Sequence, residues 1–201
     1  MTRWRELTAR LVSSGLTWGS SNQTSENQET IKRLLIQRSR IAKKATEKTP
    51  IASNIIVDNF QKGEYWLIYC EDMNQLNDLD QLLNDRGFLT HIYATGLDGS
   101  PEAELESFIR KGGIMLSIRC LDEGIDIPRI SHAVILASSQ NSRQFIQRRG
   151  RVLRVDGVKT KAHIYDLFAL PLGNEGQVAR SLVESELREL LPNRWTDFVV
   201  I

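Results

Sequence analysis

Short apolar runs alternate with helical patterns between residues 65 and 168, and this alternation constrains the fold more than any other feature of the sequence. The first run, Tyr65–Tyr69, has no charged position, which is typical of a strand buried on both faces. Four further strands are predicted at 89–94, 114–118, 133–136 and 163–168. The alternation predicts an α/β fold in which helices cover both faces of a parallel sheet.

Residues that favour helix ends separate these strands. Apolar residues at helical spacing over 73–83 predict a helix that ends near Gly87. The Ser-Pro pair at 100–101 predicts the start of the next helix, and the Gly-Gly pair at 112–113 its end. Two more helices are predicted, one from Ser142 and one over 175–191.

The N-terminal part of the chain has a different pattern. A short amphipathic piece near residues 4–12 precedes a stretch rich in Ser, Thr, Asn, Gln and Gly, which predicts a flexible connection. Helical spacing then runs from 29 to 60, and we expect Pro50 to divide it into two helices. The predicted parts are a flexible or short helical segment (1–28), a helical lead-in (29–62), the α/β domain (63–172), and a C-terminal helix and tail (173–201).

Charge and composition limit the binding partners and the cellular compartment that are expected for the protein. The 26 Lys and Arg nearly balance the 25 Asp and Glu, so overall charge gives no nucleic-acid signal, although basic residues cluster in 32–48 and 143–161. No apolar run approaches the roughly 20 residues that span a bilayer, so no membrane partner is expected. Cys70 and Cys120 lack metal-site spacing, and we expect reduced thiols in an intracellular, cytoplasmic protein.

An arginine-rich segment follows the fourth predicted strand. Gln144–Arg154, together with Arg143, contains five arginines around a single glycine. Guanidinium groups are always charged and can hold phosphate oxygens through two hydrogen bonds. Such a helix alone is ordinarily a solvated surface, but a second unusual segment, Leu121–Pro128, follows the third predicted strand. Parallel sheets bind ligands beyond the carboxyl ends of their strands, so the two segments together favour a phosphate site.

The sequence lacks a main part of the apparatus for phosphoryl transfer. None of its 13 glycines is followed by Lys and then Ser or Thr, so it has no phosphate-binding loop of the G-x-x-x-x-G-K-[ST] kind. Asp122 and Glu123 do not follow a continuous apolar strand, and we do not expect them to hold magnesium. We therefore expect that the isolated chain does not catalyse phosphoryl transfer.

These segments resemble, in order, the second RecA-like domain of superfamily 2 helicases, over about residues 34–170. Leu67–Asp72 resembles motif IV, Leu116–Pro128 resembles motif V, and Gln147–Arg154 matches motif VI at each defining position. The resemblance implies a RecA-like parallel sheet in the C-terminal motor domain of an ATP-dependent DNA helicase or translocase. It also implies ATP with Mg²⁺, for which a partner N-terminal RecA-like domain supplies the phosphate loop and the magnesium ligands.

The resemblance assigns nucleotide-binding roles to five residues. Arg151 and Arg154 are the expected arginine fingers, which stabilise charge on the transferring phosphoryl group. Gln147 is expected to orient the γ-phosphate or the attacking water. Gly124 and Asp126 are expected to meet the nucleotide, with the carboxylate accepting a hydrogen bond from the ribose.

Nucleic-acid contacts follow from the same resemblance. Thr95, Gly96 and Ser117 are expected to contact backbone phosphates, a contact that is sensitive to salt and blind to sequence. Leu153 occurs where DEAD-box RNA helicases usually carry Gly, and Lys48 resembles part of the lead-in of the XPB-like and type III restriction-like branch. Both features indicate DNA, duplex or single-stranded.

A function of another class stays open. A non-catalytic adaptor could use a RecA-like fold to dock protein or nucleic acid. The complete motif VI of Gln147–Arg154 argues against it, because fingers with no nucleotide to reach have no reason to keep that pattern of charge.

The histidines and most aromatic residues are expected to be structural. His91, His132 and His163 lie in or beside predicted strands, without ligand partners in the sequence. The aromatic residues of the first predicted strand are expected in the core, not on a base-stacking surface.

Overall fold

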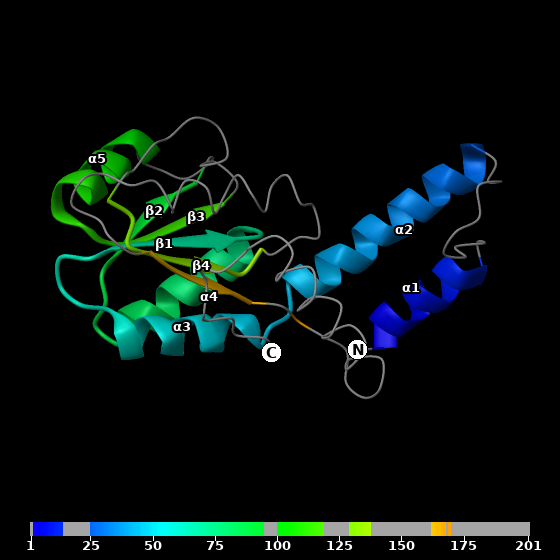
Figure 1. Cartoon of the computed structure of the whole chain (residues 1–201), viewed down its shortest axis with the longest axis horizontal. Coiled ribbons are helices and arrows are strands. Elements are labelled where there is room, and N and C mark those ends of the chain that lie inside the picture. The colour runs from blue at the N-terminus through cyan, green and yellow to red at the C-terminus, as the bar shows by residue number, and fades with distance from the viewer. Residues whose placement is uncertain are drawn as a thin grey trace.

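A parallel sheet of five strands forms the centre of the protein in a computed structural model, which describes residues 2–13, 25–94, 100–118, 129–137, 162–167 and 169 (Figure 1). The strands are β1 (Tyr65–Cys70), β2 (Thr90–Tyr93), β3 (Gly113–Ile118), β4 (His132–Ile135) and β5 (His163–Asp166). Their order is β2-β3-β1-β4-β5, and each neighbouring pair is parallel. The predicted α/β fold is confirmed.

Helices cover both faces of this sheet, as the alternation of apolar runs predicts. Figure 1 shows α3 (Lys48–Asn59) and α4 (Met73–Asn84) on one side and α5 (Pro101–Lys111) on the other. Alternate residues of β1 serve the two sides: Trp66 and Ile68 pack with α3 and α4, and Leu67 and Tyr69 pack with Phe108 of α5. Because β1 is central, its residues are almost fully buried, which explains the absence of polar alternation.

The predicted helix ends are largely confirmed. Ser100 is the N-cap of α5, and its hydroxyl accepts a 3.3 Å hydrogen bond from the backbone N–H of Ala103. Gly112 follows α5 with a φ of 73°, a conformation that L side chains rarely adopt. Gly87 has a φ of 82° three residues after α4 ends. The helices predicted from Ser142 and over 175–191 lie outside the described residues.

Two helices precede the sheet and form a hairpin. α1 (Thr2–Ser13) and α2 (Ser25–Lys43) bury Leu7 and Leu11 against Ile31 and Leu34. Figure 1 shows the hairpin extending away from the sheet. The piece near residues 4–12 is amphipathic as predicted, since its leucines are buried, whereas Val12 at its end is 64% exposed. Within the described residues, no helix is long and apolar enough to cross a membrane.

The helix break predicted at Pro50 occurs slightly earlier. α2 ends at Lys43 and α3 begins at Lys48, so Pro50 lies in the first turn of α3. The first-turn backbone N–H groups have no partner within a helix, so a residue without an N–H costs little there. The proline therefore marks the start of the second helix.

Candidate functional site at the carboxyl edge of the sheet

The carboxyl ends of the parallel strands lie at one edge of the sheet, and the predicted site residues follow these ends in the sequence. Segment 95–96 follows β2, segment 119–128 follows β3, and segment 138–154 follows β4. The predicted site residues that lie outside the described residues are Thr95, Gly96, Gly124, Asp126, Gln147, Arg151 and Arg154. Their roles therefore stay predictions, and the structure describes the edge from which their segments depart.

Ser117 is the predicted site residue that the structure describes. It lies next to the last residue of β3, opposite Tyr69 of β1, and is fully buried. Its hydroxyl donates a 3.1 Å hydrogen bond to the backbone carbonyl of Ile68. The side chain thus joins the two central strands just before the edge.

The loop after β1 is closed by the side chain of Gln75. Its Oε1 accepts a 2.9 Å hydrogen bond from the backbone N–H of Glu71, and its Nε2 donates a 3.1 Å bond to the backbone carbonyl of Lys43. Asp72 caps α4 by accepting a 3.0 Å bond from the backbone N–H of Gln75. One glutamine therefore joins the exit of β1, the start of α4 and the end of α2.

Two ion pairs reinforce the same junction. The ammonium of Lys43 lies 3.4 Å from a carboxylate oxygen of the buried Glu71, and Lys44 pairs with Asp72. Partial burial acts to raise the pKa of Asp72, but hydrogen bonds from the Lys44 side chain and from the backbone N–H of Gln75 outweigh it and lower the pKa. The negative charge on Asp72 is therefore favoured in the folded protein.

Lys48 is buried at this edge, with 2% of its surface exposed. Its Nζ donates a 2.9 Å hydrogen bond to the backbone carbonyl of Leu136, the residue after β4. Burial lowers the pKa of Lys48 to about 8, and the nearby charges of Asp166 and Glu71 partly oppose this shift while Lys43 adds to it. The start of α3 is thereby fixed to the exit of β4, which precedes the arginine-rich segment in the sequence.

The sequence contains a signal for part of this junction. Asp72 and Gln75 have the spacing of a capping box, in which a capping residue is followed three positions later by Glu or Gln. The usual box has the Gln side chain bind the N–H of the capping residue, but here it binds the N–H of Glu71, one position earlier. Its second bond, to Lys43, depends on tertiary packing and has no local signal.

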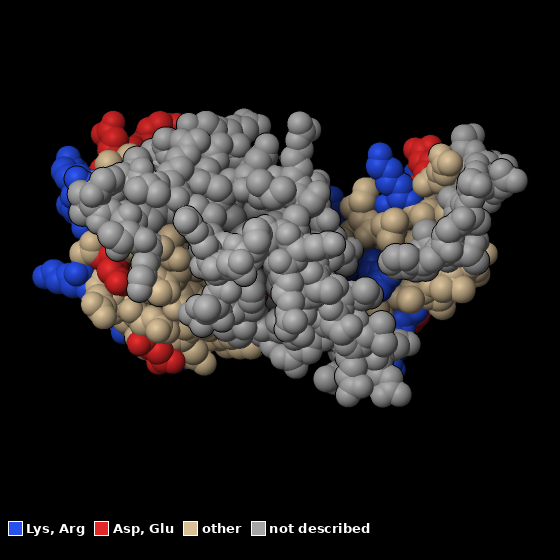
Figure 2. Space-filling model, viewed as in Figure 1, with Lys and Arg blue, Asp and Glu red and all other residues tan. Residues whose placement is uncertain are grey.

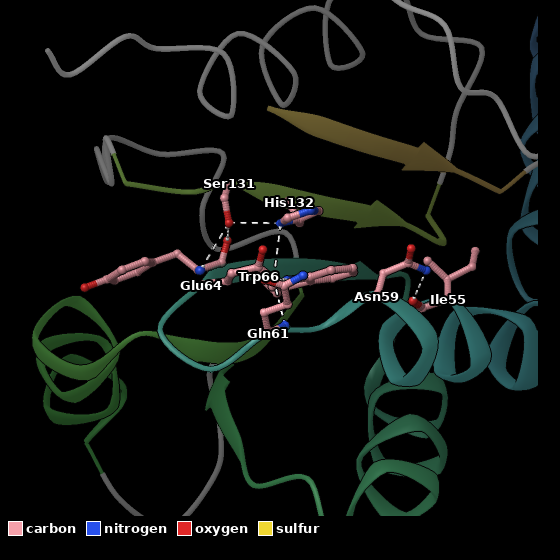
Figure 3. Close-up of polar contacts among 8 residues, drawn as sticks. Ile55, Asn59, Gln61, Glu64, Trp66, Ser131 and His132 are labelled. Atoms are coloured by element: carbon pink, nitrogen blue, oxygen red, sulfur yellow. Dashed lines mark hydrogen bonds and ion pairs between the residues drawn. The ribbon is translucent and has the colours of Figure 1, made fainter. Parts of the chain in front are cut away.

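An aromatic and polar cluster packs at the opposite edge of the sheet, where the parallel strands begin (Figure 3). The ring of Trp66 stacks on that of His132 at 4.2 Å between centroids and 7° between planes. The indole N–H of Trp66 donates a 2.8 Å hydrogen bond to Glu64, and the ring Nδ1 of His132 lies 2.9 Å from the hydroxyl oxygen of Ser131. These contacts fit the expected structural role of Trp66 and His132.

The other histidines also have structural contacts. The ring of His163 stacks on His132 at 4.8 Å, and the Nδ1 of His91 lies 2.9 Å from a carboxylate oxygen of Glu104. No group of three or more His, Cys, Asp and Glu side chains in the described part of the chain could hold a metal ion.

Comparison with known proteins shows that part of the chain matches a known protein family. Residues 47–156, more than half of the chain, match the family described as the helicase conserved C-terminal domain. The chain is also 28% identical over 152 residues to a Methanocaldococcus jannaschii protein named "Putative ATP-dependent RNA helicase MJ1505". That match covers 71% of this chain and 19% of the relative, so the chain spans less than a fifth of the relative's length.

Solved structures share the fold. The E. coli DEAD-box protein SrmB, bound to regulator of ribonuclease activity A, superposes with a TM-score of 0.53 and 13% identity, covering 77% of this chain and 84% of that one. S. cerevisiae Dbp5, bound to RNA and ADP BeF3, superposes with a TM-score of 0.55 and 15% identity, covering 78% of this chain and 38% of that one. The sheet order and helix layers described above are therefore those of a RecA-like domain.

Proposed function

Because the chain belongs to the helicase conserved C-terminal domain family, we propose that it is the second RecA-like half of an ATP-dependent nucleic-acid motor. ATP with Mg²⁺ binds between this domain and a partner N-terminal RecA-like domain, which supplies the phosphate loop and the magnesium ligands. This division of labour is supported by the sequence, in which no glycine is followed by Lys and then Ser or Thr.

One observation carries the proposal most directly. The arginine-rich segment Gln147–Arg154 lies within the family match and follows β4, whose exit at Leu136 is held by Lys48. Ligands of open parallel sheets bind beyond the carboxyl ends of the strands, and this segment follows such an end in the sequence. In this proposal the segment supplies its guanidinium groups to the face where a nucleotide is expected.

The proposed mechanism uses these residues when the cleft between the two domains closes. Arg151 and Arg154 reach the transferring phosphoryl group and stabilise its charge, an effect worth about 10³–10⁵ in rate in related phosphate chemistry. Gln147 orients the attacking water or the γ-phosphate, while Gly124 and Asp126 contact the nucleotide. Bound Mg²⁺ neutralises charge on the phosphates.

We propose DNA as the nucleic acid, gripped through Thr95, Gly96 and the end of β3, where Ser117 joins β3 to β1. Leu153 within the sequence Gly-Arg-Val-Leu-Arg supports this choice, because DEAD-box RNA helicases usually carry Gly there. RNA is the second candidate, since the Methanocaldococcus jannaschii relative is named an RNA helicase. ATP turnover stimulated by DNA, by RNA or by both distinguishes the two substrates.

The proposal is tested with Arg154→Ala in the enzyme that contains both RecA-like domains. We expect turnover to fall by at least about 10³-fold while affinity for DNA is unchanged, since the finger acts on the phosphoryl group. Arg143→Ala, in the same segment but without a proposed role, serves as the matched control. Turnover that survives Arg154→Ala would overturn the finger assignment.

A further inference from the structure

Charge is distributed unevenly along this nearly neutral chain. Residues 2–44 carry nine Lys and Arg against three Glu, a formal charge of +6, whereas residues 45–201 carry 17 basic and 22 acidic residues, a charge of −5. The positive charge is therefore concentrated in the segment that contains the α1–α2 hairpin. Figure 2 shows basic side chains on the surface that this hairpin forms.

The basic residues of α2 occupy the side opposite its apolar side. Ile31 and Leu34 are buried against α1, whereas Lys32, Arg33 and Arg40 are exposed. With 3.6 residues per turn, the three basic side chains fall within about 100° of arc, turned away from the buried pair. We call Lys32, Arg33 and Arg40 the basic face of α2.

Little in the described structure offsets the charge of this face. No ion pair within the described part of the chain involves any of its three residues. The acidic residues of α2, Glu26 and Glu29, both precede Lys32, so the helix from there onwards carries only basic charge. The face is therefore available to a negatively charged partner.

The base of α2 is fixed to the α/β domain. Lys43 pairs with Glu71, Lys44 pairs with Asp72, and the backbone carbonyl of Lys43 accepts a hydrogen bond from Gln75. These contacts join the end of α2 to the loop after β1, at the carboxyl edge of the sheet. A partner bound to the basic face is therefore held in a set position relative to that edge.

We propose that the basic face of α2 docks the phosphate backbone of a nucleic-acid duplex. Lys32 and Arg40 are separated by about 12 Å along the helix, and a duplex presents one charge per roughly 1.7 Å of its axis, so several phosphates fall within reach. A single strand is the poorer fit because single strands are held by stacking of bases on aromatic rings. The guanidinium of Arg38 already lies over the ring of Trp4, at 4.0 Å from its centroid.

This docking surface includes none of the residues proposed above for nucleic-acid contacts, Thr95, Gly96 and Ser117. It rests on the proposed function only in taking nucleic acid as the substrate of the motor. Its action needs neither ATP nor the partner domain, so binding by the purified 201-residue chain tests it directly. ATP turnover by the two-domain enzyme tests the proposed motor function independently.

The test compares three proteins for binding to a labelled 20-base-pair duplex over a series of salt concentrations. The triple variant Lys32→Gln, Arg33→Gln and Arg40→Gln removes the face, and glutamine keeps good helix propensity. The matched control, Lys62→Gln, Arg110→Gln and Lys111→Gln, removes the same charge from exposed sites elsewhere. Circular dichroism verifies that both variants keep their helices.

We expect the triple variant to bind duplex about 10²-fold more weakly at 0.1 M salt, and its salt slope to fall by about 2.7, since each lost phosphate contact removes about 0.9. The control should bind as the unaltered chain does. Equal losses in both variants would show an effect of net charge alone and overturn the proposal. Unchanged binding by the triple variant, or no duplex binding by the unaltered chain, would also overturn it. Tighter binding of a single strand than of the duplex would reject the duplex as partner.

Discussion

The ammonium group of Lys48 donates a hydrogen bond to the backbone carbonyl of Leu136, which lies 88 positions later in the chain. The bond links the first residue of α3 to the exit of β4 in an environment where the lysine is 2% exposed. Because a buried carbonyl without a partner is costly, the lysine and the strand exit stabilise one another. Burial of the charged group nevertheless costs free energy, and this cost depends on pH.

Lys48 should make the unfolding free energy rise with pH. Its pKa is about 8 in the folded protein and has an ordinary value of 10.5, so the unfolded chain binds more protons between these two values. Below pH 8 the full cost of burying the charge is present, and it is relieved as pH rises to 10.5, by on the order of 3 kcal/mol. Urea denaturation from pH 7 to 10 should show the protein gaining stability relative to Lys48→Met.

A matched variant separates burial from other effects of pH. Lys62 is exposed, so Lys62→Met should show no such change relative to the unaltered protein. A stability difference between the unaltered protein and Lys48→Met that stays constant over this range would contradict the lowered pKa of Lys48.

Gly112 should tolerate alanine poorly. Its φ of 73° and ψ of −164° form a region that is almost confined to glycine, and an added Cβ would lie 2.9 Å from the backbone oxygen of Glu64. We expect Gly112→Ala to lower the unfolding free energy by roughly 2–4 kcal/mol. Gly87 also has positive φ but has open space around it, so Gly87→Ala should cost only about 1–2 kcal/mol. If urea denaturation shows the same loss of unfolding free energy for both variants, the contact between the added Cβ and Glu64 does not contribute to the cost of Gly112→Ala.

Much of the fold could be predicted because its signals are local. The apolar run at Tyr65 predicts β1, the central strand. A strand covered on both faces exposes neither face to solvent, so its sequence does not alternate between apolar and polar residues. Ser100 and Gly112 predict the two ends of α5 because capping and positive φ depend on individual residue types. Strand ends were less accurate: Leu89, predicted within a strand, precedes β2 and is 88% exposed.

The candidate site could be predicted only in part because its supports are tertiary. The bond between Lys48 and Leu136 and the bond from the Gln75 side chain to Lys43 depend on how α2, α3 and the strand exits pack together. No periodicity or short motif encodes contacts over such separations. The stack of Trp66 on His132 likewise arises from the register of β1 and β4, which pairs these two residues directly. The arginine segment, in contrast, has a motif that is readable without packing.

The ring of His132 should remain neutral at pH values well below the usual pKa of histidine. Burial lowers its pKa to about 4, with Glu64 acting to raise it and His163 acting to lower it further. The ring chemical shifts of His132 should therefore stay constant in NMR spectra from pH 8 to 5.5. In concentrated urea the same ring should titrate near 6.5. Because the unfolded chain binds the proton more tightly, the unfolding free energy should fall as pH drops from 6.5 to 4. A midpoint near 6.5 in the folded protein would contradict this prediction.

The isolated chain should not hydrolyse ATP, with or without DNA. Its arginine segment can stabilise a transferring phosphoryl group only when another domain holds the phosphates and the magnesium ion, and the sequence has no loop of the kind that does so. A partner domain that carries this loop should show little turnover alone and much more after this chain is added. Adding the chain with Arg154→Ala to the same partner should leave turnover at the level of the partner alone. DNA-stimulated turnover by these 201 residues without a partner would mean that the chain holds a complete active site, and the assignment of Arg151 and Arg154 to a shared site would be wrong.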